Sequence, residues 1–273
     1  MYYSFVTNRP VTFDLSAIPH GFTKRDMEIT NLTLTGPFIK VAGFRPRLWL
    51  NGLSKRLSIV FPVIGTKNLE STTVGFDESL NFDVSVAHIR GYFQCFTYLE
   101  ALKQCGAWQE VDVTNPSKWF NQMLGAVSDP AAVAVHCRFG DFLALGDTFG
   151  VLGSDYYQAA LDRAVPVRGD EDSKIYVFSD DIDRARTLFQ SIKCAVPVEF
   201  VSPPESSSAA ESLVLMSKAE RIVIANSTYS WWAAALNDKS KKRVFAPSKW
   251  FRGLDDPNQI YPADWITVES SWV

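Results

Sequence analysis

The sequence lacks the residue patterns that identify several common enzyme classes. Its 273 residues include only four cysteines and three histidines, and no two cysteines form a C-x-x-C pair, so the ligand spacing of a zinc site is missing. Neither the G-x-G-x-x-G fingerprint of dinucleotide-binding proteins nor the phosphate loop of P-loop NTPases occurs. A G-x-S-x-G nucleophile elbow is also absent. We therefore expect no zinc site, and we interpret the cysteines as free thiols.

Neither charge predominates, and no apolar run is long. The 27 Lys and Arg nearly balance the 30 Asp and Glu, which gives a formal net charge of −3 and no general attraction to nucleic acid. No apolar run approaches the ~20 residues that a membrane helix needs. The first residues also lack the basic and apolar regions of a signal peptide. With 47% hydrophobic residues, the chain can bury the core of one large domain or two smaller ones.

The second half of the chain has the more regular pattern. From Pro130 onward, short apolar runs alternate with amphipathic segments, which is typical of βαβ units and a parallel sheet. The predicted strands are Ala132–Cys137, Ile175–Phe178, Val198–Val201, Ile222–Ala225 and Val244–Ala246. The predicted helices are Ser154–Ala164, with Ser154 as N-cap, Ile182–Ile192, Ala209–Ala219 and Tyr229–Asn237. Residues 126–273 are therefore predicted to form a Rossmann-type half.

Residues 1–125 are less regular and are predicted to form a separate amino-terminal domain. They contain an expected strand at Val11–Leu15, apolar segments at Leu57–Ile64 and Ala87–Gln94, and an expected helix at Thr97–Gln104.

Three of the predicted strands end in polar or charged residues. The first is followed by His136-Cys137-Arg138-Phe139-Gly140-Asp141, the second by Ser179-Asp180-Asp181, and the fourth by Asn226-Ser227-Thr228. In open parallel sheets, ligands bind beyond the carboxyl ends of the strands. If these strands are neighbours, the three clusters converge on one site.

Two of these clusters have the chemistry of an anion site. Asn226, Ser227 and Thr228 precede a helix whose first N–H groups have no internal partner and lie at its positive end, which suits phosphate. The alternative is plain N-capping by Ser or Thr. Arg138 offers a planar fork of donors that matches phosphate oxygens. Its alternative role is a salt bridge with Asp141, three residues further on.

The remaining candidates have more than one interpretation. His136 is either a contact to a nucleobase or a hydrogen-bonded core histidine. Asp180 and Asp181 either cap the following helix or accept hydrogen bonds from a nucleoside. Asp181 and Asp183 also form an Asp-x-Asp pair, a pattern that in some enzymes binds a metal ion together with a sugar nucleotide.

The order of these motifs resembles glycosyltransferase family 11, the α-1,2-fucosyltransferases, whose pattern runs HxRRGDY, FSDD and ANSxFSWWGAWLN. The matching segments are His136-x-Arg-x-Gly-Asp-Phe, Val177-Phe-Ser-Asp-Asp, Leu215-Met-Ser and Ala225-Asn-Ser-Thr-Tyr-Ser-Trp-Trp, with Gly91-Tyr92-Phe93-Gln94 and Ser154-Asp155-Tyr156-Tyr157 ahead of or between them. The resemblance covers roughly residues 10–265.

The resemblance implies a GT-B-like α/β fold of two Rossmann-type halves. Residues 126–273 would bind GDP-fucose and residues 1–125 the acceptor, a glycan with a terminal galactose. The implied reaction is inverting, metal-independent transfer of L-fucose to a galactoside hydroxyl, with no cofactor. A cytoplasmic location is implied for a bacterial protein, with peripheral association at the inner membrane face as an option, and a Golgi location for a eukaryotic one.

The resemblance also implies roles for individual residues. Arg138 would bind the diphosphate and stabilise the leaving group. His136, Asp180, Asp181 and Glu211 would lie along the nucleotide, and Asn226, Ser227 and Thr228 would hold phosphate. Asp141 is the candidate general base, because inverting transfer needs a carboxylate or imidazole near the acceptor hydroxyl.

Three features depart from the family pattern. Phe139 stands where the pattern has its second arginine. The acidic position ahead of the Leu-x-Leu-Met-Ser stretch falls on Ser212, with Glu211 next to it. The glycine-rich segment GGLGNQxFQYA, with which family members open, has no match, so the amino-terminal half is expected to be incomplete. The alternatives to an active fucosyltransferase are therefore a catalytically inactive nucleotide-sugar-binding relative or fragment, and a metal-dependent glycosyltransferase that uses Asp181 and Asp183.

Overall fold

The chain divides into two compact units. The first is Met1–Glu110 with Pro257–Ile260, and the second is Val111–Asp256 with Tyr261–Val273. The computed structural model describes residues 11–14, 31–33, 39–42, 67–71, 73–80, 86–104, 106, 108, 110–165 and 173–273. The division predicted after residue 125 falls inside helix α4 (Lys118–Val127), which lies within the second unit.

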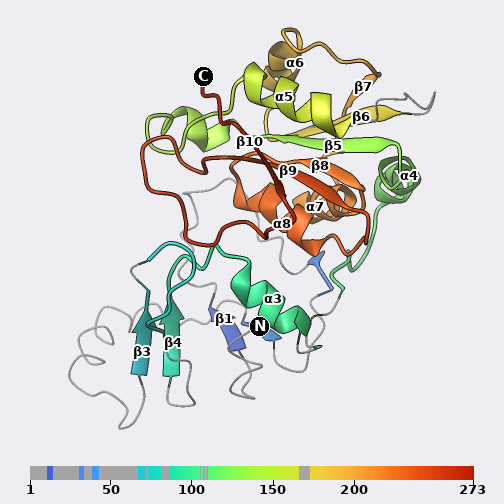
Figure 1. Cartoon of the computed structure of the whole chain (residues 1–273). Coiled ribbons are helices and arrows are strands. Elements are labelled where there is room, and N and C mark those ends of the chain that lie inside the picture. Colours follow the sequence, from blue (N-terminus) through green and yellow to red (C-terminus); the bar gives the residue numbers. More distant parts are fainter. Residues whose placement is uncertain are drawn as a thin grey trace. The chain divides into compact units, whose positions relative to one another are not determined.

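Six of the described strands form one parallel sheet in the second unit (Figure 1). They are β5 (Ala132–Cys137), β6 (Lys174–Ser179), β7 (Val198–Phe200), β8 (Arg221–Val223), β9 (Arg243–Pro247) and β10 (Ile266–Val268). Their order across the sheet is β10-β9-β8-β5-β6-β7, and each neighbouring pair is parallel. This is the strand order of doubly wound nucleotide-binding folds, in which β5 and β8 flank the point where the order reverses.

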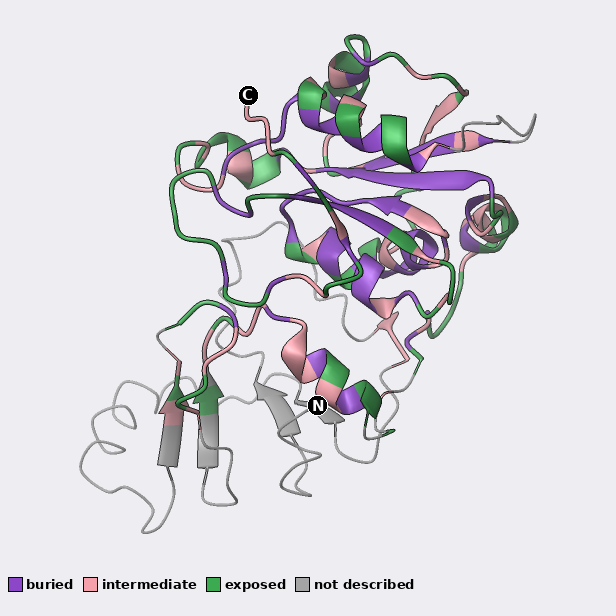
Figure 2. Ribbon diagram, viewed as in Figure 1, coloured by how far each residue is buried: buried purple, intermediate pink, exposed green. Residues whose placement is uncertain are grey.

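Helices cover both faces of this sheet, which explains why its central strands are almost continuously apolar. α5 (Ser154–Ala164) and α6 (Ile182–Phe189) pack on one face, and α4, α7 (Ala209–Ser217) and α8 (Thr228–Leu236) on the other (Figure 1). β5 is buried along its whole length (Figure 2). The predicted α/β class with a parallel sheet is confirmed.

The predicted strands and helices of the second unit are present, with shifted ends. α6 ends at Phe189 rather than Ile192, because the next residues form turns. The N-cap of α5 is Gly153 rather than Ser154: Gly153 has the extended backbone that precedes the first turn, and no side chain caps this helix. The apolar pattern does not predict α4, or β10, an edge strand of three residues.

The described strands of the first unit form two parallel pairs. β1 (Val11–Asp14) pairs with β2 (Ile39–Ala42), and β3 (Lys67–Glu70) pairs with β4 (Val86–Arg90). Helix α3 covers Thr97–Gln104, as predicted. The apolar segment Leu57–Ile64 lies outside the described residues. Among the helices that the structure describes, none has both the length and the apolar character needed to cross a bilayer.

Tyr156 provides a test of how the helical layer is fastened to the sheet. Its fully buried hydroxyl donates to the carbonyl of Ile224 at 2.5 Å and of Phe245 at 3.4 Å, joining α5 to the end of β8 and the middle of β9. We expect Tyr156→Phe to lower the free energy of unfolding by about 1–3 kcal/mol, because a buried carbonyl loses its donor. Urea denaturation measures the change. Tyr92→Phe, at a side chain 72% exposed, is the control and should change stability by less than about 0.5 kcal/mol; equal effects would contradict the assignment.

Candidate functional site

The structure brings the three polar strand ends together at one edge of the sheet. β5 lies between β6 and β8, with Val135 paired to Val177 on one side and to Val223 on the other. Arg138 and Asn226 each lie three residues beyond the paired Val135 and Val223, so the residues that follow β5 and β8 are neighbours in register. The expectation that these strands are adjacent is confirmed, and the residues lie where ligands bind in doubly wound sheets.

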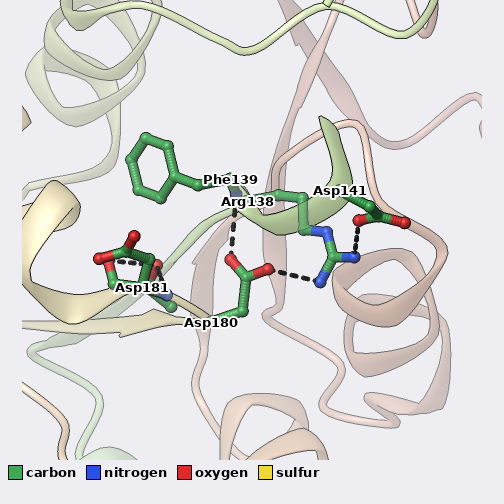
Figure 3. Close-up of polar contacts among 6 residues, drawn as sticks. Arg138, Phe139, Asp141, Asp180 and Asp181 are labelled. Atoms are coloured by element: carbon green, nitrogen blue, oxygen red, sulfur yellow. Dashed lines mark hydrogen bonds and ion pairs between the residues drawn. The ribbon is translucent and has the colours of Figure 1, made fainter. Parts of the chain in front are cut away.

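Arg138 is the central side chain of this edge (Figure 3). Its guanidinium lies between two carboxylates, contacting Asp141 through Nη2 and Asp180 through Nη1, the latter at 2.7 Å. It also lies over the ring of Phe142, 5.3 Å from the centroid. The pair with Asp141 that the sequence offers as an alternative is therefore present. The pair with Asp180 joins the ends of β5 and β6.

Asp180 holds both the side chain and the backbone of the loop after β5. Its Oδ1 accepts a hydrogen bond from the backbone N–H of Phe139 at 3.0 Å, while its Oδ2 pairs with Arg138. Gly140 passes so close that a Cβ at this position would overlap with Oδ2 of Asp180, and its φ of +28° also favours glycine. The close approach of Asp180 therefore gives a steric reason for the glycine of the Arg-x-Gly-Asp run.

Asp181 has a different environment from Asp180. Its Oδ1 accepts from the backbone N–H of Arg184 at 3.0 Å, which makes it the N-cap of α6, and its Oδ2 pairs with the Arg184 side chain at 3.0 Å. Of the interpretations left open by the sequence, helix capping is the one seen for Asp181. In the described part of the chain, no group of three or more His, Cys, Asp or Glu side chains is arranged to hold a metal ion.

Phe139 points away from the polar edge. Its side chain is 6% exposed and belongs to the apolar cluster that contains Val135, Cys137 and Tyr157, on the α5 side of the sheet. Figure 3 shows its ring directed away from the Arg138 guanidinium.

Asn226 is committed to the scaffold. Its Nδ2 donates towards the carbonyls of Phe149 at 2.9 Å, Gly150 at 3.2 Å and Trp250 at 3.1 Å. These contacts fasten the loop after β5 and the loop after β9 to the end of β8. The side chain is buried, so the structure places it beneath the edge and not on its surface.

Ser227 and Thr228 lie at the start of α8. Ser227 is the N-cap by backbone position, but no side chain caps the helix, so the N-capping alternative is not what the structure shows. The Ser227 side chain is buried, and its carbonyl accepts from the N–H of Trp231 at 2.9 Å. Thr228 is exposed. This helix start lies at the same sheet edge as Arg138, because β5 and β8 are neighbours. It has the partial positive charge that favours an anion.

His136 and Glu211 lie on the α7–α8 side of the sheet. The His136 ring is buried and lies 5.4 Å from the ring of Tyr229, whose hydroxyl donates to the carbonyl of Ala209 at 2.5 Å. Glu211 is 2% exposed, and its Oε1 accepts from the backbone N–H of Ser117, the N-cap of α4, at 2.5 Å. Glu211 thus joins the first turns of α7 and α4, and its Oε2 is buried with no hydrogen-bond partner in the described residues.

Cys137 does not have the properties of a nucleophile. Burial raises the pKa of its thiol to about 12, with its hydrogen bond to Tyr157 acting in the opposite direction. Because the thiolate is the reactive form, this thiol is unreactive at neutral pH.

Two contributors to this edge are not identified by sequence reasoning. Tyr229 supports His136, and Gly140 makes room for Asp180. The aromatic residue after Asn226-Ser227-Thr228 and the glycine of the Arg-x-Gly-Asp run are the signals that could have indicated them.

Asn226→Asp tests whether this side chain supports the scaffold. The substitution places a carboxylate oxygen against three carbonyls in place of a donor, and we expect it to lower the free energy of unfolding by about 2–4 kcal/mol. Asn121→Asp, on an exposed position of α4, is the charge-matched control and should stay within about 0.5 kcal/mol. Urea midpoints measure both. An unchanged midpoint for Asn226→Asp would show that the side chain does not hold the two loops.

Comparison with known proteins identifies a matching family and two relatives. The chain matches the model of glycosyl transferase family 11 over residues 110–269. O-antigen biosynthesis glycosyltransferase WbnK of Escherichia coli is 36% identical over 138 residues, which are 50% of this chain and 44% of the relative. Alpha-1,2-colitosyltransferase of Escherichia coli is 28% identical over 142 residues, 50% of this chain and 48% of the relative. The chain spans about half the length of these curated relatives.

A solved structure of glycosyl transferase family 9 from Veillonella parvula DSM 2008 aligns with 88% of this chain and 74% of its own, at 11% identity and a TM-score of 0.41. The family 11 match spans more than half of the chain and includes the ends of β5, β6 and β8. It confirms the resemblance read from the motifs: the chain belongs to glycosyl transferase family 11.

Proposed function

We propose that this protein transfers L-fucose from GDP-fucose to a galactoside hydroxyl, forming an α-1,2 linkage with inversion. Membership of glycosyl transferase family 11 supports glycosyl transfer, and one relative is named for α-1,2 transfer of colitose. The single observation that carries the proposal is the position of Arg138, a guanidinium 11% exposed, at the switch point of the sheet. The start of α8, which no side chain caps, follows the neighbouring strand β8 at the same edge.

The proposed chemistry requires stabilisation of a departing diphosphate. As the glycosidic bond to fucose breaks, negative charge develops on the β-phosphate of GDP. Arg138 presents a fixed fork of N–H donors to it, and the first N–H groups of α8 add partial positive charge. Both groups are in place before reaction, which is the condition for effective electrostatic stabilisation. The scheme uses protein donors in place of a metal and needs no cofactor.

The acceptor hydroxyl needs a base. Asp141 is the candidate, because its carboxylate is 67% exposed at the same edge as Arg138. The acceptor, a glycan with a terminal galactose, is proposed to contact residues of the first unit. Asp180, which holds Arg138 and Phe139, and Asn226, which holds two loops, are proposed to act through the scaffold, whereas Thr228 is proposed to face the phosphate.

The alternatives remain distinguishable from this proposal. A nucleotide-sugar-binding relative without turnover would bind GDP-fucose and release no GDP. A metal-dependent transferase would need Asp181 and Asp183 as ligands; the capping of α6 and the pairing with Arg184 already engage both oxygens of Asp181.

Turnover with and without chelator tests the reaction. The protein is incubated with GDP-fucose and a terminal β-galactoside, and GDP release and product linkage are measured by coupled assay and NMR. We expect release that EDTA does not reduce, because the charge is neutralised by Arg138 and helix N–H groups. Abolition by EDTA with recovery on adding a divalent cation would favour the metal-dependent alternative. A parallel reaction with a colitose donor establishes which sugar is preferred.

Substitution of Arg138 tests the donor site directly. We expect Arg138→Ala to weaken GDP binding by about 10- to 100-fold, because charged hydrogen bonds to phosphate are lost. Arg138→Lys keeps the positive charge but loses the planar fork of donors, so its GDP affinity should lie between those of the unmodified protein and of Arg138→Ala. Arg163→Ala, at an exposed position near the end of α5, is the control. Isothermal titration calorimetry measures the dissociation constants, and unchanged binding in Arg138→Ala would refute the role given to this residue.

A further inference from the structure

The two carboxylates that contact Arg138 are held in different ways. Asp180 is 15% exposed and uses one oxygen for Arg138 and the other for the backbone N–H of Phe139. The loop is fitted to it at Gly140, where any Cβ would meet its Oδ2. Asp141 is 67% exposed and pairs with Arg138 through Nη2. One partner is therefore built into the fold, and the other projects into solvent.

One nitrogen of the guanidinium is not engaged by either carboxylate. Its Nε is buried and has no hydrogen-bond partner among the described residues. Nε and Nη2 form one edge of the guanidinium, and two phosphate oxygens can accept from that edge together. Asp141 engages only Nη2. The edge is thus half occupied by a solvent-exposed carboxylate.

We propose that Asp180 is a positioning residue that fixes Arg138, and that Asp141 is an exchangeable partner displaced from Nη2 when a diphosphate binds to the Nε–Nη2 edge. The identity of that diphosphate, the one carried by the donor sugar, rests on the proposed function. Displacement also frees the Asp141 carboxylate, so the candidate base becomes available only after the donor has bound. The acceptor is then activated second.

The same substitution, Asp to Asn, should change diphosphate affinity in opposite directions at positions 141 and 180. Asp141→Asn removes a competitor for Nη2 and should tighten binding of GDP and of inorganic pyrophosphate by about two- to fivefold, the range of an exposed ion pair. Asp180→Asn leaves one acceptor oxygen for two donors, so its amide NH2 faces either Nη1 or the Phe139 N–H, and it should weaken both by about tenfold or more. If the carboxylates acted only through their charge, both substitutions would tighten binding. Asp155→Asn, exposed in the first turn of α5, changes the same charge without contacting Arg138 and is the control.

A double-mutant cycle separates positioning from a general structural role. If Asp180 acts through Arg138, Asp180→Asn should have no further effect on pyrophosphate affinity in the Arg138→Ala background. Binding is measured by calorimetry well below the thermal midpoint of each variant. If Asp180→Asn does not fold, Asp141→Asn, a substitution of an exposed side chain, still tests whether Asp141 competes with the diphosphate for Nη2.

Each outcome has a consequence. Opposite shifts for the two variants and no additivity with Arg138→Ala support the inference. Shifts in the same direction, full additivity, or unchanged binding in Asp141→Asn overturn it. Opposite shifts with pyrophosphate, but no tighter binding of GDP than of pyrophosphate, would keep the inference and refute the proposed nucleotide donor. Absence of pyrophosphate and GDP binding in the unmodified protein would overturn both.

Discussion

The ion pair between Arg138 and Asp180 is the contact on which the candidate site depends. It links the residues that follow β5 and β6, and it fixes a guanidinium at the edge where doubly wound sheets bind ligands. The same carboxylate holds the backbone of Phe139, so the direction of the loop after β5 and the position of the guanidinium are set together. Because a cation held in this way is already oriented before an anion binds, less conformational entropy is lost on binding.

The far end of the same loop is fixed by a neutral contact. The Asn226 Nδ2 donates towards the carbonyls of Phe149 and Gly150, and also towards that of Trp250 in the loop after β9. The segment from Arg138 to Gly150 is therefore anchored by a carboxylate at its start and by an amide at its end. The exposed residues between these anchors, Asp141 among them, are free to change partners while the frame stays in place. A site that responds to a ligand needs a fixed backbone frame together with side chains, such as that of Asp141, that can exchange partners.

Local pattern predicts much of the fold and less of the site. The apolar runs predict the central strands, because strands covered on both faces have no polar side to display. They do not predict α4 or β10, whose positions depend on packing against elements distant in sequence. The convergence of the three strand ends follows from the rule for parallel sheets. The role of Asn226 does not, because its partners are 24, 76 and 77 residues away, and no local spacing records such contacts.

The alternation of side chains along β5 accounts for the buried position of Phe139, which stands where the family pattern has its second arginine. Val133, Val135, Cys137 and Phe139 belong to the apolar cluster on the α5 side, whereas His136 contacts Tyr229 of α8 on the other side. In a strand, successive side chains point to opposite faces, so the residue after Arg138 faces the core and not the polar edge. A cation there would require a buried partner, and Phe139 fills the same space without one. With Phe139 turned to the core, Arg138 is the cation at this edge that Asp180 holds, and its Nε has no partner in the described part of the chain.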